Sequence, residues 1–247
     1  MIDDATLAAA LATHAGQLLL EIRDDLGHDD PQRLKDEGDR RSHEVIAARL
    51  ADERPTDAVL SEEGRDDLDR LNYERVWIVD PLDGTREFGE AGRTDWAVHV
   101  ALAIGGAVAI GAVALPGLGV TLASHPPASV PVRADGPPRV IASRTRPGPA
   151  AEAIAAALSG QLVFMGSAGA KAMAVVRGEA DIYAHTGGQY EWDNCAPVAV
   201  ALAAGLHASR LDGSPLVYNN EDPYLPDLLI CRPEFADAAI EAAAGLS

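Results

Sequence analysis

Two carboxylates that lie three residues apart, Asp80 and Asp83, follow a short apolar run. Pro81 fixes the backbone angle φ between them, and Gly84 permits a conformation that residues with a Cβ avoid. Such a strand end can direct both carboxylates and the Leu82 carbonyl into one cleft. A divalent cation between close carboxylates removes their repulsion, and oxygen ligands without His or Cys favour Mg²⁺ over Zn²⁺. The alternative is a capped β-turn, since Asp-Pro-x-Asp-Gly is also good turn chemistry.

Two further acidic positions strengthen the metal interpretation. Glu62 and its neighbour Glu63 end another short apolar segment, and Asp193 begins a predicted helix. Alone, the pair is a solvated edge and Asp193 a helix cap. Together with the first two carboxylates they supply acids from three structural elements, which is what a two-metal site needs. In such a site, cations about 4 Å apart hold an attacking water and a leaving oxygen in line. Gly84 and Thr85, at a predicted helix start, could bind a phosphate oxygen, and the Thr85 hydroxyl could orient the water.

Small and basic residues predict where a phosphorylated substrate binds. The segment 166–169, which includes Ser167, follows a predicted strand and opens a predicted helix, so its backbone favours an anion. Lys171 and Arg86 could each reach a second phosphate, and the alternative for each is a surface ion pair. A plain strand-to-helix connection is the alternative for the segment itself.

These residues require a scaffold of helices and short strands. Apolar spacing predicts a helix over 3–26, a polar loop over 27–38 and a helix over 39–52. Strands are predicted at 58–60 and 76–79, and two or three more within 96–113. Residues 123–138 contain five prolines and are predicted to form a lobe boundary. Beyond it, strands at 139–142, 162–164 and 180–183 alternate with helices at 148–159, 169–177 and 193–204, and a strand–loop–strand tail leads to a helix at 233–244. The pattern predicts an α+β lobe over 1–122 that carries most metal ligands and an α/β lobe over 139–247 that carries Asp193 and the substrate pocket.

Composition excludes several classes of function. The chain has 247 residues, of which 47% are apolar, so it can bury a sizeable core and is not a disordered acidic chain. Its net charge of −18 argues against a nucleic-acid polymer as partner. The acidic start predicts no signal peptide, and the longest apolar stretch, Trp96–Leu118, is broken by glycines and proline, so no membrane insertion is expected. We therefore expect a cytoplasmic location.

The acidic motifs resemble the signature set of the inositol monophosphatase superfamily. They are Ser61-Glu62-Glu63, the phrase Asp-Pro-Leu-Asp-Gly-Thr-Arg-Glu-Phe over 80–88, and Trp192-Asp193. The phrase, together with residues 166–171 and 211–216, is most similar to the CysQ-type branch, which hydrolyses adenosine 3′,5′-bisphosphate (PAP). The resemblance covers about residues 5–235.

The resemblance implies a five-layer αβαβα sandwich and roles for individual residues. Glu62, Asp80 and the Leu82 carbonyl would bind one Mg²⁺, and Asp80, Asp83 and Asp193 a second; a third ion and inhibition by Li⁺ are family traits. Thr85 and Asp39 would activate the water. The residues around Lys35 depart from the family pattern, so Asp36 is the alternative to Asp39. Glu191 resembles a contact to sugar hydroxyls, and Arg210, with Asp212, lies in a loop expected to shape the base pocket.

The sequence therefore predicts a Mg²⁺-dependent phosphomonoesterase that cleaves PAP, or the related sulfonucleotide PAPS, by direct attack of a metal-activated water in sulfur assimilation. The alternatives are an inositol-1-phosphate or fructose-1,6-bisphosphate phosphatase and a non-catalytic metal- or nucleotide-binding regulatory module. The expected partner is a small phosphorylated nucleotide or sugar phosphate, and a homodimer is allowed.

Tyr190 and Trp192 could stack on adenine, with core packing preferred; Cys195 is expected to be a small buried residue rather than a redox group. No histidine is assigned a catalytic role.

Overall fold

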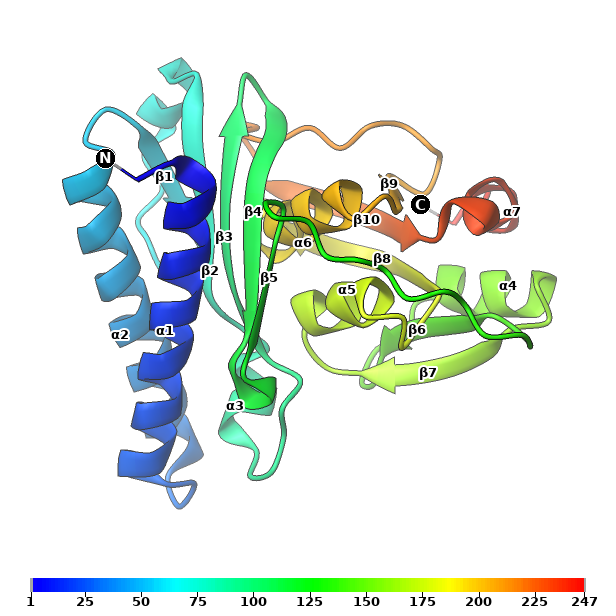
Figure 1. The fold of residues 1–247 in the computed structure, drawn as a ribbon, viewed down its shortest axis with the longest axis horizontal. Coiled ribbons are helices and arrows are strands. Elements are labelled where there is room, and N and C mark those ends of the chain that lie inside the picture. The colour runs from blue at the N-terminus through cyan, green and yellow to red at the C-terminus, as the bar shows by residue number, and fades with distance from the viewer. Residues whose placement is uncertain (1, 247) are drawn as a thin grey trace.

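Two five-stranded sheets alternate with three layers of helices in this computed structural model, which describes residues 2–246 (Figure 1). The first sheet has the order β1-β2-β3-β4-β5 and the second β7-β6-β8-β10-β9. Helices α1 and α2 cover the outer face of the first sheet, α5 and α6 lie between the sheets, and α4 and α7 cover the outer face of the second. The predicted five-layer sandwich is therefore confirmed.

The first half of the chain builds the first sheet and its outer helices. Strand β1 pairs in parallel with β2, and the remaining neighbours are antiparallel. The elements are α1 (Asp4–Leu26), α2 (Pro31–Glu53), β1 (Ala58–Ser61), η1 (Leu68–Asn72), β2 (Arg75–Asp83), α3 (Thr85–Gly89), β3 (Ala97–Ile104), β4 (Ala107–Leu115), η2 (Pro116–Leu118) and β5 (Val120–Ala123).

The second half builds the second sheet and the remaining helices. Strand β6 pairs in parallel with β7 and β8, and β10 pairs antiparallel with β8 and β9. The elements are β6 (Arg139–Ser143), α4 (Pro149–Ala157), β7 (Gln161–Met165), α5 (Ala168–Val176), β8 (Ile182–Tyr190), α6 (Glu191–Ala203), β9 (His207–Ser209), β10 (Tyr224–Cys231), η3 (Pro233–Phe235) and α7 (Ala236–Ala242).

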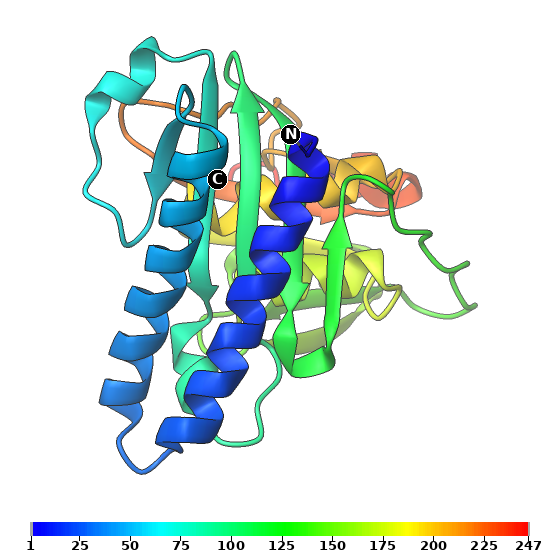
Figure 2. The same cartoon turned by 60° about the vertical axis from the view of Figure 1, so that its left-hand side comes forward.

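Helix α1 owes its length to its apolar face and its caps. The Asp3 side chain accepts the N–H of Thr6, and the N–H of Gly27 donates to the Arg23 carbonyl. The helix is long and apolar enough by composition to cross a membrane, but half of its most apolar window is buried on the sheet. Its apolar residues therefore have a structural explanation in the core beneath it (Figure 2).

The middle layer joins the two sheets into one core. Met173 of α5 and Cys195 of α6 belong to the same buried cluster as Val113 of the first sheet and Leu228 of the second. Helix α6 lies so close to β4 that a Cβ on Gly111 would come within 2.6 Å of the Ala199 Cβ. The first sheet ends and the second begins on either side of the proline-rich segment, but the division into two lobes stays a prediction because the core is shared.

Several predicted boundaries were wrong. Residues 31–38 are not a loop, because α2 starts at Pro31, a residue that fits the first helical turn. The Asp30 side chain caps this start by accepting the N–H of Arg33, and Leu34 is buried. Strands β2 and β8 run past their predicted ends, and the last helix is split into η3 and α7. The other predicted strands and helices are present within a few residues.

Candidate active site

A cluster of carboxylates gathers where β2, α5 and α6 meet. Oxygens of Asp80, Asp83 and Asp193 lie within 4.8 Å of one another. The sequence predicts that Asp80 and Asp83 follow the strand. They lie instead within its last residues, where the pairing of β2 with β3 shifts register. Asp193 is the third residue of α6 instead of its cap, and its carboxylate accepts the N–H of Tyr190 at 2.6 Å. The acidic residues from distant segments therefore converge.

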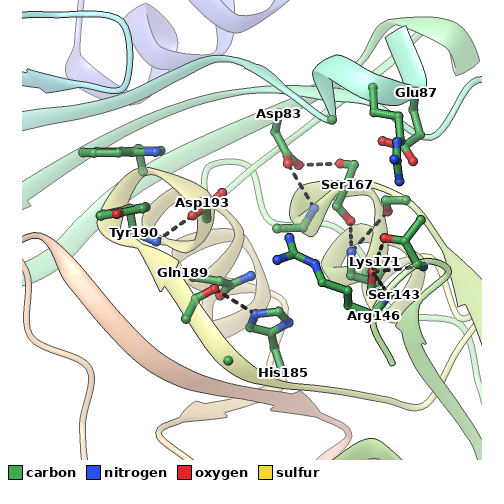
Figure 3. A pocket seen from close by; sticks show the side chains of 18 of the residues that line it. Asp83, Glu87, Ser143, Arg146, Ser167, Lys171, His185, Gln189, Tyr190 and Asp193 are labelled. Carbon is green, nitrogen blue, oxygen red and sulfur yellow. Dashed lines mark hydrogen bonds between the residues drawn. The ribbon is translucent and has the colours of Figure 1, made fainter. Parts of the chain in front are cut away.

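Asp83 is held by the start of α5. Its carboxylate accepts the Ser167 hydroxyl and the N–H groups of Ala168 (3.1 Å) and Gly169 (2.6 Å), and His99 Nε2 lies 3.3 Å from it (Figure 3). Burial raises the pKa of Asp83, but the bonds from His99 and Ser167 and the charge of Lys171 outweigh it and lower the pKa to about 2. The anion at this helix start is thus the protein's own carboxylate, which corrects the expectation that residues 166–169 bind a phosphate directly.

The other carboxylates of the cluster hold their protons more tightly. Burial and the neighbouring charge of Glu62 raise the pKa of Asp80 well above its usual range. Desolvation in the cleft, together with nearby Asp193 and Asp83, raises the pKa of Glu62 to about 7 despite its hydrogen bond with Asp80. Burial and the charge of Asp83 raise the pKa of Asp193 to about 6. Such mutual repulsion between buried acids is what a bound cation relieves.

The donor set fits a hard divalent cation. It consists of carboxylates with the Leu82 carbonyl between two of them. The imidazole of His99 contacts Asp83 and the Trp192 carbonyl, the latter at 3.0 Å. Oxygen-only ligands of this kind suit Mg²⁺. The Leu82 carbonyl also accepts the Thr85 hydroxyl at 3.1 Å. The residues present are therefore able to hold the metal that the motifs predicted.

Helix α2 brings a further acid to the cluster. Asp39 Oδ1 lies 3.4 Å from the Thr85 hydroxyl, which donates to it. Burial, and the charges of Glu63 and Glu62, raise the pKa of Asp39 to about 7. Asp36 is exposed and accepts the side chain of Gln32 on the same helix. The structure therefore brings Asp39, and not Asp36, to Thr85.

The carboxylates open into a cavity of about 850 Å³ between the two halves of the chain. Its lining includes Glu62, Asp83, Gly84 and Asp193 together with the basic side chains Arg86, Arg146, Lys171 and His185. Arg144 forms salt bridges with Glu87 and Glu90, whereas within residues 2–246 neither Arg86 nor Arg146 forms one. Two guanidinium groups are thus available to an anion in the cavity.

Lys171 does not reach out as predicted. Its ammonium is buried and donates to the backbone carbonyls of Gly166 (3.3 Å) and Ser167, with its nitrogen 5.4 Å from the centre of the Tyr183 ring. Burial lowers its pKa, against the pull of Asp83. Lys171 therefore contributes charge to the cavity wall while its hydrogen bonds hold the turn before α5.

Two predicted substrate contacts lie elsewhere. Glu191 is fully buried, and its oxygens accept the N–H groups of Asn219 (2.6 Å) and Asn220 (2.8 Å), so it fastens the loop before β10. Arg210 donates to buried Asp227 at 2.7 and 2.6 Å. Both side chains are committed to partners within the fold, and the structure does not bring either one to the cavity.

The sequence interpretation missed several residues of the site. It gives His99 no role, although a histidine in an otherwise apolar buried strand needs a polar partner, and that signal could have been used. Arg146, His185 and Tyr224 carry no local motif, and only the fold brings them to the cavity. Tyr190, for which the sequence favours core packing, is 45% exposed and lines the cavity beside Trp192, which partly packs on the core. Cys195 is buried, as predicted, and burial raises its pKa well above the usual range.

Comparison with known proteins connects this geometry to a family. The family model described as inositol monophosphatase matches residues 3–244. A 3′-phosphoadenosine 5′-phosphate phosphatase from Mycobacterium leprae is 54% identical, over 95% of this chain and 91% of that protein. The 3′(2′),5′-bisphosphate nucleotidase CysQ of Escherichia coli is 29% identical, over 87% of this chain and 94% of its own.

Solved structures agree with the fold. The crystal structure of CysQ from Bacteroides thetaiotaomicron superposes with a TM-score of 0.78 at 28% identity, covering 93% of this chain and 97% of that one. Inositol monophosphatase II from Staphylococcus aureus, at 19% identity, shares the fold with a TM-score of 0.80 over 97% of this chain and 96% of its own. The predicted family, fold and enzyme class are confirmed. This chain belongs to the inositol monophosphatase family.

Proposed function

We propose that the protein is a Mg²⁺-dependent phosphatase that hydrolyses PAP to AMP and phosphate. The proposal is carried by one observation. A single cavity brings together carboxylates that could hold a metal and guanidinium groups that have no salt-bridge partner among the described residues. The relatives that are 52–54% identical and named for PAP support the choice of substrate. PAPS, which carries the same 3′-phosphate, and a role in sulfur assimilation belong to the same proposal.

The chain's own carboxylates would hold the cations. Glu62, Asp80 and the Leu82 carbonyl would bind one, and Asp80, Asp83 and Asp193 the other, as the motifs imply. When bound, Mg²⁺ would offset the charge of the carboxylates and of the phosphate, and so lower the barrier to attack at phosphorus. A third ion and inhibition by Li⁺ are expected from the family.

Asp39 and Thr85 would prepare the attacking water. Thr85 orients it by hydrogen bonding, and Asp39, whose pKa of about 7 suits proton transfer near neutral pH, accepts its proton. The bond between phosphorus and the ribose oxygen would break as the new bond to water oxygen forms. The ribose oxygen would leave with the bonding electrons and take a proton from solvent, and Asp39 would return its proton to solvent. No bond between phosphate and a side chain is required.

The basic residues explain how a very acidic protein attracts a bisphosphate. A net charge of −18 repels the substrate, so local cations must favour it. Arg86 lines the same cavity as the carboxylates, and so do Arg146 and His185, which Figure 3 shows. We infer that they bind the phosphate that is not cleaved. A cytoplasmic location and a homodimer stay predictions from the sequence.

The test is phosphate release from equal concentrations of PAP, inositol 1-phosphate and fructose 1,6-bisphosphate, each with Mg²⁺ and with EDTA. We expect PAP to react fastest, EDTA to abolish the reaction, and Asp83→Asn to lose it while staying folded by circular dichroism. Faster cleavage of either sugar phosphate, or PAP cleavage that survives EDTA, would contradict the proposal. No release from any substrate would favour a non-catalytic binding module.

A further inference from the structure

One wall of the cavity is aromatic. Tyr190 at the end of β8, Trp192 in the first turn of α6 and Tyr224 at the start of β10 all line it. The rings of Tyr190 and Trp192 are stacked, with centroids 4.8 Å apart and planes 10° apart, and Tyr224 meets Tyr190 edge-on at 6.1 Å and 82°. We call these three rings the aromatic ledge.

Two of the three rings of the aromatic ledge lie largely outside the core, and only Trp192 packs partly against it. Tyr190 and Tyr224 are 45% and 46% exposed, whereas Trp77, Trp96 and Tyr183 are buried. Single exposed rings are ordinary on a protein surface, but a stacked group that lines a cavity leaves flat apolar area for a ligand to cover.

Local backbone features place the aromatic ledge. Tyr190 and Tyr224 are cross-strand partners in the pairing of β8 with β10. Gly188, at a φ of +91°, makes room for the Tyr224 ring, because a Cβ there would come within 2.5 Å of its Cε2. The strand end is thus shaped to seat a ring over it.

The aromatic ledge also lies beside the chemistry. The N–H of Tyr190 donates to the Asp193 carboxylate, as Figure 3 shows, so a single hydrogen bond joins the ring-bearing residue to the carboxylate cluster. A substrate with its phosphate at the carboxylates has its next substituents within reach of the rings. The basic side chains Arg146 and His185 line the same cavity, where they could bind the second phosphate.

We propose that the aromatic ledge binds the purine base of the substrate by stacking, and so selects nucleotides over sugar phosphates. This inference rests on the proposed function, since it assigns the part of PAP that the metal site does not touch. Every base has a π face, and removal of a stacking ring weakens nucleotide binding about tenfold. Inositol and fructose phosphates have no flat π face and gain nothing comparable from the rings.

The test compares PAP with ribose 3,5-bisphosphate, which is PAP without its base. Tyr190→Ala and Tyr224→Ala are each expected to raise KM for PAP about tenfold with kcat within about twofold of the wild type. The same variants should leave the kinetics of the base-free substrate unchanged. Tyr190→Phe should retain the wild-type KM, because it keeps the ring. Tyr73→Ala removes a tyrosine that is 41% exposed outside the cavity and serves as the matched control.

Equilibrium binding of AMP, measured by calorimetry in EDTA, separates the two proposals because it needs no turnover. If PAP is not hydrolysed but AMP binding is lost in Tyr190→Ala, the proposed function fails and the aromatic ledge stands. If PAP is hydrolysed with an unchanged KM in both Ala variants, the aromatic ledge is refuted and the function stands. Equal losses on both substrates would show that Tyr190 only supports Asp193, and would also refute the ledge.

Discussion

Neighbouring groups give the carboxylates of the site different tasks. Asp83 faces two backbone N–H groups, a hydroxyl and an imidazole, and the bonds that it accepts keep its pKa near 2. Asp80, a few ångströms away, is surrounded by other acids, and its pKa is raised. Asp83 is therefore fixed and ionised, whereas the other acids of the cluster share protons that a bound cation would displace.

At this scale, Asp39→Asn tests the water-activating role. The amide can still hydrogen bond to Thr85 but cannot accept the water's proton, so kcat for PAP should fall by about 10²- to 10⁴-fold. Binding of Mg²⁺ and the melting temperature should change little, because Asp39 is not among the clustered ligands. Steady-state kinetics and calorimetric titration of the metal measure both quantities.

Asp36→Asn is the matched control for that variant. It makes the same chemical change one helical turn earlier, at an exposed residue that contacts Gln32. The control should keep wild-type kcat. A large loss in Asp36→Asn with none in Asp39→Asn would reverse the assignment and mean that α2 uses the other register in solution.

At the scale of elements, α2 sets the distance between Asp39 and Thr85 through a glycine. Gly38 packs on α3 so closely that a Cβ there would lie 2.7 Å from Phe88 Cε1 and 3.0 Å from Leu82 Cδ2. Ser42, one turn on, donates to the Pro81 carbonyl at 2.8 Å. The helix is therefore in direct contact with the strand end that carries Asp80 and Asp83.

Gly38→Ala should separate α2 from α3. Alanine favours the helix by about 1 kcal/mol, but the steric overlap costs about 1–3 kcal/mol, so the free energy of unfolding should fall slightly. The larger effect should be on kcat, because Asp39 moves with its neighbour. Chemical denaturation and kinetics on PAP give the two numbers.

Gly16→Ala in α1 is the comparison for this variant. A Cβ there would lie 2.6 Å from Pro116 Cγ, on the opposite side of the sheet from α6. It should cost similar stability without changing kcat. Equal effects of the two variants on kcat would mean that loss of stability, and not displacement of Asp39, reduces the rate.

The elements also show how far sequence reasoning reaches. Apolar spacing identified α1 and most strands, because their buried faces are continuous in the sequence. The start of α2 was missed although Asp30 and Pro31 signal a helix start. Leu34 is the only large apolar side chain that is buried in this segment, which is otherwise polar and resembles a loop. The acidic motifs located the carboxylate cluster, because a metal site would require those residue types at those positions. Glu191 and Arg210 were misplaced because their partners, Asn220 and Asp227, are set by the fold.

For the whole molecule, the acidic site is a source of instability that a cation removes. The folded state holds the protons of Asp80, Glu62 and Asp193 more tightly than the unfolded chain does. Below the unfolded pKa near 4, acids whose pKa is raised by folding do not reduce the free energy of unfolding, because they are protonated in both states. As the pH rises toward the folded pKa values near 6 and 7, they lower the free energy of unfolding, because only the unfolded chain loses these protons easily. Stability of the metal-free protein should therefore decrease between these limits, in the direction opposite to acid denaturation.

Thermal melts in EDTA and in Mg²⁺ test this expectation. In EDTA, the melting temperature should be lower at about pH 8 than at about pH 5, by roughly 5 °C or more. A tenfold change in an acid's proton affinity on folding corresponds to about 1.4 kcal/mol, which relaxation and solvent screening reduce. Mg²⁺ should raise the melting temperature far more at the higher pH, because it binds the ionised carboxylates. Asp80→Asn removes the charge at the centre of the cluster and should flatten the metal-free profile while abolishing the response to Mg²⁺. A wild-type profile in EDTA that is flat or rises with pH would mean that the four carboxylates are not crowded in solution, and the metal site inferred from them would be wrong.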